Sequence, residues 1–452
     1  MNSLHTTKDS CVTFEKWSEI NATLKKDKIA ILALQETHLD ETATQRIQDL
    51  FGKRMIILNS QLERNPRASA GVAFVINRDI IDVKEMKTNE LIKGKALALT
   101  VKWNDQETTL INVYAPNKRQ DHKDFWETIE SERTQTHTGK PDFVLGDFNV
   151  TEEAIDRMPP KSDSFEATTA IREFRLALEL QDQWRHENPK GREYTYRAIH
   201  NERTIKSCLD RIYVARSKIK YTFDWTMAPS TVKTDHWLVA VKYAPKNAPY
   251  IGPGRWTVPV QATKNSKIIE HIIEKGMILQ EEMTELRNNP NRHTSDKNHQ
   301  TLWKTFKFTS ARWIELVTKN NHYKRATKIK NLQEDRKKTI ENPNFETDQN
   351  LQWDEAILAR EIEYLEKKNS KENRELTRAK LTLHGEKLGG MWTAMSKSKK
   401  PRDHLQRLKI PNTTLQKYEH RLKGMAELAK RYHEDLQEKT WTQMRPEKEN
   451  KQ

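Results

Sequence analysis

Residues 141–150 read PDFVLGDFNV, and this stretch decides both the fold and the chemistry expected of the chain. Residues 143–145 form a short apolar run, which predicts a buried strand that ends at Gly146. Asp147 and Asn149 follow one residue apart, so their side chains should point the same way. A carboxylate there can accept a proton or bind a cation, and a carboxamide can donate to an anionic oxygen. Because polar turns use the same residues, the surrounding sequence has to decide between a turn and an active site.

Length and charge limit the class of protein. The chain has 452 residues, so we expect two regions, and its 32% of charged residues suggests that one of them has little core. A net charge of +15 favours a polyanionic partner, nucleic acid before a membrane. Cys11 and Cys208 form no metal or redox pattern, which favours a nuclear or cytoplasmic location over secretion. No apolar stretch is long enough to span a bilayer.

Up to about Tyr243, short strand-like runs and segments with helix-like spacing of apolar residues follow each other in turn. The runs that predict strands are residues 29–34, 55–58, 71–76, 96–101, 109–114, 194–199, 209–214 and 237–243. The segments that predict helices are residues 14–24, 123–133 and 169–180. This order predicts packed sheets with helices outside them.

Two of the predicted strands end in side chains that can do chemistry. Glu36 follows the buried run 29–34 with only Gln35 between them, and Tyr114 ends the run 109–114. A carboxylate beyond a buried strand occupies the place where α/β-type folds put their chemistry, although a loop carboxylate is equally ordinary. A tyrosine at a strand end can offer its hydroxyl to a phosphate, although packing is its commoner use.

Two further acidic residues lie in or beside the last predicted strands. Asp210 interrupts an apolar run, so it needs a partner. Arg211 beside it and a histidine from elsewhere are both candidates. Asp235 and His236 precede the run 237–243, where ordinary loop polarity is the alternative to a functional pair.

The composition changes after Tyr243. Residues 244–259 are rich in Pro and Gly and predict a domain boundary. The remainder has helical spacing with charged faces, and residues 324–338 are strongly basic. This part is either a solvated, coiled-coil-like extension or a basic arm that lies on nucleic acid.

Five motifs follow one another in a fixed order. They are LQET at 34–37, NVYAPN at 112–117, GDFN at 146–149, LDRI at 209–212 and TDH at 234–236. This set resembles the endonuclease/exonuclease/phosphatase superfamily, which has the DNase I-like fold. Within it, the set is similar to the apurinic-type endonucleases of LINE-type, non-LTR retrotransposons. GPGRW at 252–256 and the helical remainder resemble the connector that precedes their reverse transcriptase, and no polymerase motif of the Tyr-x-Asp-Asp kind is present.

The resemblance implies a fold and a domain plan. We expect an α/β (α+β) fold, a four-layer α-β-β-α sandwich of two packed sheets, over residues 1–243. A Pro/Gly linker (244–260) and a basic helical connector (261–452) should follow. The family opens with a central strand that ends in an asparagine, whereas this chain begins with Met1 and Asn2. The resemblance therefore implies that the first strand is missing and that N-terminal truncation impairs activity.

The resemblance also implies metal and proton-transfer residues. Glu36 and Asp235 would bind a divalent cation, Mg²⁺ or alternatively Mn²⁺. Asp147 would orient or deprotonate the attacking water, or protonate the leaving oxygen.

Other residues are implied to contact the phosphate. Asn149 and Tyr114 would hold it, His236 would contact the scissile group, and Asp210 would orient the imidazole and favour its cationic form. Thr195 matches a family position near the phosphate.

Together these features predict a Mg²⁺-dependent endonuclease that nicks DNA. The alternatives are a non-catalytic nucleic-acid-binding relic and a lipid or inositol phosphatase of the same fold.

Overall fold

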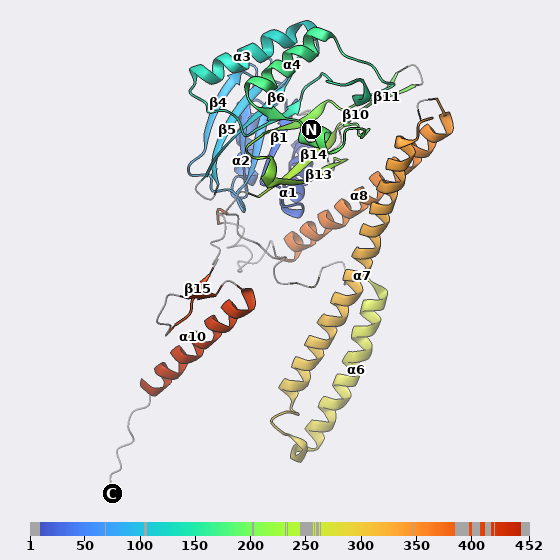
Figure 1. The fold of residues 1–452 in the computed structure, drawn as a ribbon. Helices are drawn as coiled ribbons and strands as arrows, with labels where there is room; N and C mark the ends of the chain where they lie inside the picture. The colour runs from blue at the N-terminus through green and yellow to red at the C-terminus, as the bar shows by residue number, and fades with distance from the viewer. Residues whose placement is uncertain are drawn as a thin grey trace. The chain divides into compact units, whose positions relative to one another are not determined.

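The computed structural model describes residues 10–67, 69–103, 106–200, 203–230, 232, 234–244, 256, 258, 262, 264–345, 347–384, 397–399, 407–411, 417–419 and 421–443. The chain divides into two compact units, Met1–Lys246 with Pro253–Pro401, and Asn247–Gly252 with Arg402–Gln452 (Figure 1). Met1 and Asn2, on which the expectation of a missing strand rests, lie outside the described residues. So does most of the expected linker, residues 244–260.

A six-stranded sheet carries the GDFN stretch. Its strands, in spatial order, are β4 (Lys87–Ile92), β5 (Ala96–Trp103), β6 (Gln106–Tyr114), β7 (Phe143–Asp147), β12 (Asp210–Ala215) and β9 (Leu180–Gln181). Neighbouring strands are antiparallel, except for the parallel pair β6 and β7. Parallel strands need a crossover connection, and helix α3 (His122–Gln135) supplies it between β6 and β7.

Smaller sheets complete the β-structure of this unit. The strands β1 (Ile31–Gln35), β3 (Val72–Asn77) and β2 (Met55–Ser60) pair in that order, and β13 (Thr222–Pro229) pairs with β14 (Trp237–Tyr243). Apolar side chains from both groups, such as Phe74 and Val239, pack against Leu99 and Val214 of the six-stranded sheet. The third sheet contains β10 (Tyr196–His200), β11 (Arg203–Ser207) and β8 (Arg157–Met158).

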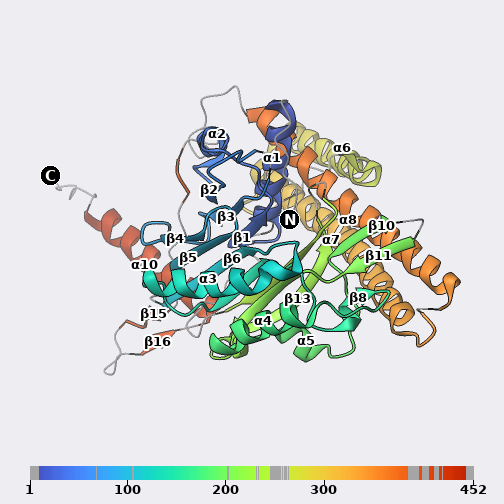
Figure 2. The ribbon, with the colours of Figure 1, turned by 90° about the horizontal axis from the view of Figure 1, so that it is seen from above.

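Helices cover the outer faces of these β-layers (Figure 2). Trp126 of α3 is buried with Phe174 of α4 (Phe165–Ala177) against the six-stranded sheet. On the opposite side, Trp17 of α1 (Ser10–Lys26) packs with α2 (Glu41–Phe51) against β1, β2 and β3. The order helix, sheet, sheet, helix confirms the predicted mixed α/β fold class.

The rest of the chain is mostly helical, as predicted. The long helices are α6 (Ser266–Asn288), α7 (His299–Glu341) and α8 (Gln349–His384), and α7 contacts both of the others. The second unit contains β15 (Leu408–Lys409), β16 (Tyr418–Glu419) and α10 (Leu422–Gln443). Shorter helical segments are η1 (Arg119–Asp121), η2 (Ala154–Asp156), α5 (Gln183–Glu187), η3 (Ile219–Tyr221) and η5 (Pro290–Arg292). None of the described helices is long and apolar enough to cross a membrane.

Some elements were not predicted from the sequence, and local features explain why. Strand β4 (KTNELI) is a polar edge strand and therefore lacks a strong apolar pattern. In β13 the alternation is interrupted by a register shift between Phe223 and Thr226. Helix α2 was not predicted either, although Asp40 is a typical N-cap residue. Its side chain accepts a hydrogen bond from the amide of Ala43 at 2.7 Å.

Candidate active site

Three neighbouring strands of the six-stranded sheet carry polar side chains at one level. Tyr114 is the partner of Asp147 in the parallel β6–β7 ladder, and Asp210 is its partner in the antiparallel β7–β12 ladder. Because neighbouring strands lie about 4.8 Å apart, these side chains form one continuous row. Asp147 is 1% exposed and Asp210 is 6% exposed, so both carboxylates are held inside the protein.

Gly146 lets β7 pass close to β6 just before Asp147. Its φ is +140°, and a Cβ built on it would lie 2.0 Å from the carbonyl oxygen of Val113. Only glycine accepts both the conformation and the contact. The sequence predicted that the strand stops at Gly146, whereas β7 continues through it to Asp147. The close approach that Gly146 allows is to the neighbouring backbone.

Gly146→Ala is expected to lower the free energy of unfolding by about 3 kcal/mol, because strained backbone and steric overlap add up. Urea denaturation followed by far-UV circular dichroism measures this change. Gly139→Ala is the matched control, since a Cβ at Gly139 meets no atom within 4 Å. Equal stability of the two variants would contradict the close approach.

Asn149 is fixed beside the row by its own backbone and by an arginine. It adopts a left-handed conformation with φ of 51°, which asparagine tolerates. Its amide donates to Oδ1 of Asp147 at 2.9 Å, and its Nδ2 donates to the carbonyl of Ala115 at 2.9 Å. Arg119 donates to the carbonyl of Asn149 at 2.5 Å and to Asp163 at 3.0 Å. The second N–H of Nδ2 is the one that could be offered to a phosphate oxygen.

Asp210 and His236 form a buried pair. Nδ1 of His236 lies 2.7 Å from Oδ2 of Asp210, so the structure selects the histidine from the two partners that the sequence left open. Arg211 instead contacts Asp156 and Asp182. Burial alone would lower the pKa of His236, but the charge and hydrogen bond of Asp210 outweigh it and raise that pKa. Burial would raise the pKa of Asp210, but His236 holds it below its usual value.

Glu36 and Tyr114 meet where β1 and β6 end. Glu36 has φ of 49°, and its carboxylate accepts a hydrogen bond from the Tyr114 hydroxyl. Burial, together with the hydrogen bond and charge of Glu36, raises the pKa of Tyr114 well above its usual value, so the phenol keeps its proton. Behind this pair, Nε2 of Gln35 donates to Oδ1 of Asn112 at 2.6 Å. That buried bond joins β1 to β6 and fixes the position of Glu36.

The donor atoms of Asp147, Asp210 and His236 all lie within 4.8 Å of one another. Carboxylate oxygens are the ligands that hard divalent cations prefer, so the chemistry of this group fits such an ion. Among the described residues, the group does not include Glu36 or Asp235, which the resemblance implied as metal ligands. Asp235 is exposed, although it directly precedes His236.

Thr195 supports the site, and so do two residues that were not recognised from the sequence, Arg119 and Asp163. Thr195, expected near the phosphate, is fully buried, and its hydroxyl accepts from the amides of Leu209 at 3.0 Å and Asp210 at 3.1 Å. It therefore holds the backbone that carries Asp210. Arg119 donates a hydrogen bond to the carbonyl of Asn149, and Asp163 accepts another from Arg119. In the sequence, only the position of Arg119 just after NVYAPN could have drawn attention to Arg119.

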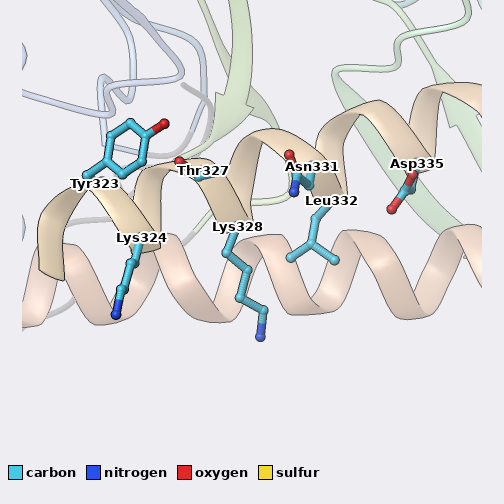
Figure 3. A pocket seen from close by; sticks show the side chains of 7 residues that line it. All are labelled: Tyr323, Lys324, Thr327, Lys328, Asn331, Leu332 and Asp335. Atoms are coloured by element: carbon cyan, nitrogen blue, oxygen red, sulfur yellow. The ribbon is translucent and has the colours of Figure 1, made fainter. Parts of the chain in front are cut away.

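A hollow of about 350 Å³ lies along α7, away from these residues in sequence (Figure 3). Its lining includes Tyr323, Lys324 and Lys328, and all of its lining residues belong to α7. Lys328 pairs with Glu361 of α8 at 2.7 Å. The hollow contains none of the site residues predicted from the sequence.

Comparison with known proteins finds similar nucleases and a transposon protein. A curated relative, the transposon TX1 uncharacterized 149 kDa protein of Xenopus laevis, is 30% identical over 148 residues. That match covers 32% of this chain and 11% of the relative, so the chain corresponds to a small part of that protein.

Solved structures with a similar arrangement include the endonuclease domain of TRAS1, a telomere-specific non-LTR retrotransposon. It is 12% identical, with a TM-score of 0.39, and the match covers 51% of this chain and 94% of that one. The AP endonuclease LMAP from Leishmania major is 17% identical, with a TM-score of 0.41, and the match covers 50% and 81%.

The family comparison covers the part of the chain that contains the candidate site. Residues 18–236 match the endonuclease/exonuclease/phosphatase family, and this range contains Glu36, Asp147 and His236. This part of the chain belongs to the endonuclease/exonuclease/phosphatase family.

Proposed function

We propose that this chain is a metal-dependent phosphodiesterase that nicks DNA for a retrotransposon. The observation that carries the proposal is the row of Tyr114, Asp147 and Asp210, with His236 bonded to Asp210. Two carboxylates, an imidazole and a hydroxyl around one point suit in-line attack on a phosphodiester. Residues 1–243 would carry this activity, and residues 261–452 would form the helical connector.

Each side chain takes a role that its contacts support. Asp147 occupies the middle of the row, where it can take a proton from the attacking water or return one to the leaving oxygen. His236, whose pKa Asp210 raises, donates a charge-assisted hydrogen bond to a non-bridging phosphate oxygen. Tyr114 has a single O–H, so it can donate to the phosphate only by leaving Glu36. Asn149 offers its second N–H.

The carboxylates at this edge fit Mg²⁺, and Mn²⁺ suits the same oxygen ligands. Asp147 and Asp210 supply oxygen atoms close to the imidazole of His236, and Glu36 and Asp235 are further carboxylates on the adjoining segments. Neutralisation of phosphate charge is the chemistry that such an ion supplies when bound.

Two observations favour DNA as the substrate. The net charge of +15 attracts a polyanion. The relative that is 30% identical over 148 residues is named as a transposon protein, and a transposon is a DNA element. Lipids and inositol phosphates would meet the same row of side chains, so the assay includes both.

The full chain is expected to convert supercoiled plasmid to the nicked circle in Mg²⁺, and to stop when a chelator is added. His236→Ala should lower the rate by about 10²-fold or more, because the phosphate loses a charged donor, while DNA binding persists. The same preparations are tested on sphingomyelin and an inositol polyphosphate. Salt-sensitive DNA binding without any metal-dependent turnover would instead identify a non-catalytic relic.

A further inference from the structure

The β10–β11 hairpin places two cationic side chains opposite each other. Arg197 of β10 lies directly opposite Lys206 of β11 in the antiparallel ladder. Like charges in that position repel each other, and Lys206 is only 3% exposed, so water cannot screen it. A buried cation requires an anionic partner, and the described strands β10 and β11 contain no acidic residue.

Glu355 of α8 is that partner. It is 0% exposed, and its carboxylate accepts a hydrogen bond from Lys206 and another from Arg197 at 3.0 Å. Arg336 of α7 also donates to Glu355 at 2.8 Å, and to Glu193, just before the hairpin, at 2.9 Å. Figure 2 shows α7 and α8 beside β10 and β11. One carboxylate therefore joins α7 and α8 to this hairpin.

The ionisation states agree with this geometry. Burial alone would raise the pKa of Glu355, but Lys206, Arg336 and Arg197 lower it to about 2. Burial lowers the pKa of Lys206 to about 8 despite the attraction of Glu355, so the amine still carries its proton at neutral pH.

The same cluster reaches the segment that carries His236. The guanidinium groups of Arg197 and Arg336 each lie 5.0 Å from the ring centroid of Trp237, the residue after His236. Cation–π attraction of this kind holds the ring in place. The amide of Trp237 donates to the carbonyl of Thr195 at 2.7 Å, and the Thr195 hydroxyl accepts from the amide of Asp210, the partner of His236.

We propose that Glu355 is a positioning residue. It fastens α7 and α8 to the β10–β11 hairpin and, through Trp237, fixes the strand start that presents His236. The helical half would then be part of the working site rather than a passive connector. The activity readout of this proposal rests on the proposed nuclease function, whereas its structural readout does not.

Glu355→Gln tests the proposal, because it keeps the size of the side chain and removes its charge. Hydrogen exchange is expected to rise several-fold in peptides covering residues 194–200 and 234–240, while β5 and β6 stay protected. In the plasmid assay kcat should fall by about tenfold, as for loss of a residue that orients a site residue, with KM for DNA little changed.

Glu361→Gln is the matched control. Glu361 pairs with Lys328 across the same two helices, but both side chains are exposed, at 41% and 56%. It makes the same change in net charge as Glu355→Gln, so any general effect on DNA binding should be shared. Its exchange pattern and kcat should match those of the unmodified chain.

A double variant separates positioning from simple misfolding. Glu355→Gln combined with Lys206→Met removes one anion and one cation, which restores the net charge of the buried cluster. Exchange protection and kcat should both partly recover.

The outcomes are distinguishable. Unchanged exchange in Glu355→Gln would overturn the fastening role. If exchange rises in Glu355→Gln but its kcat equals that of Glu361→Gln, the positioning role is overturned. If the unmodified chain does not nick at all, the proposed function fails, and a changed His236 imidazole NMR signal in Glu355→Gln then decides whether the helices position this residue.

Discussion

Asp147→Asn is expected to lower the rate of plasmid nicking by about 10³-fold, within the range found when a proton-transfer group is removed. The amide keeps the shape of the carboxylate, and it can still accept a hydrogen bond from the amide of Asn149, which now lies 2.9 Å from Oδ1. It cannot take a proton from water. The loss should appear in kcat, because the position of Asp147 in the row is unchanged.

Asp224→Asn is the control for this substitution. Asp224 lies on β13 and forms an exposed pair with Lys242 at 2.6 Å, so the same chemical change occurs at an exposed side chain that is not part of the row. Its nicking rate should remain within about twofold of the unmodified chain, because exposed ion pairs contribute little. Comparable losses in the two variants would remove Asp147 from the proposed mechanism.

Asp210→Asn is expected to slow nicking by about 10²-fold or more and to change its pH dependence. Without the carboxylate, burial dominates and the pKa of His236 falls. If the cationic imidazole is the active form, the alkaline limb of the pH–rate profile moves to lower pH. The pH dependence of kcat, measured from pH 5 to 9, checks the direction of this shift.

The same substitution alters stability in a defined pH window. The folded pKa of His236 is raised above 6.5, so its contribution is complete below 6.5 and is lost as pH rises through the folded value. The folded pKa of Asp210 is lowered below 3.8, so its contribution is complete above 3.8 and is lost as pH falls through the folded value. Melting temperatures of the two proteins should therefore differ most between pH 3.8 and 6.5. A difference that instead grows with pH above that window would contradict the pairing.

The strand-end residues could be predicted because each follows a strong local pattern. The buried apolar runs before them form β1 and β7 in the structure. Glu36 directly follows β1, and Asp147 is the last residue of β7. The partner of Asp210 could not be chosen, because Arg211 and His236 are both chemically suitable and only the three-dimensional fold separates them.

The residue that we propose to position His236 could not be predicted either. Glu355 is separated from Lys206 by 149 residues, and it lies in a helix full of charged side chains. On the sequence it looks like any other residue of a solvated face. Whether such a charge is buried depends on which helix packs on which strand. That packing cannot be inferred from the composition or from the spacing of residues.

The register of β7 limits where insertions and deletions can occur in the gene. Tyr114 and Asp210 flank Asp147 only because β7 is aligned with both of its neighbours residue for residue. Deleting one residue within β7 would turn the pleat over and send the central carboxylate to the opposite face. Insertions and deletions in descendants should therefore accumulate in the connections, whereas the number of residues in this strand stays constant for as long as cutting is selected.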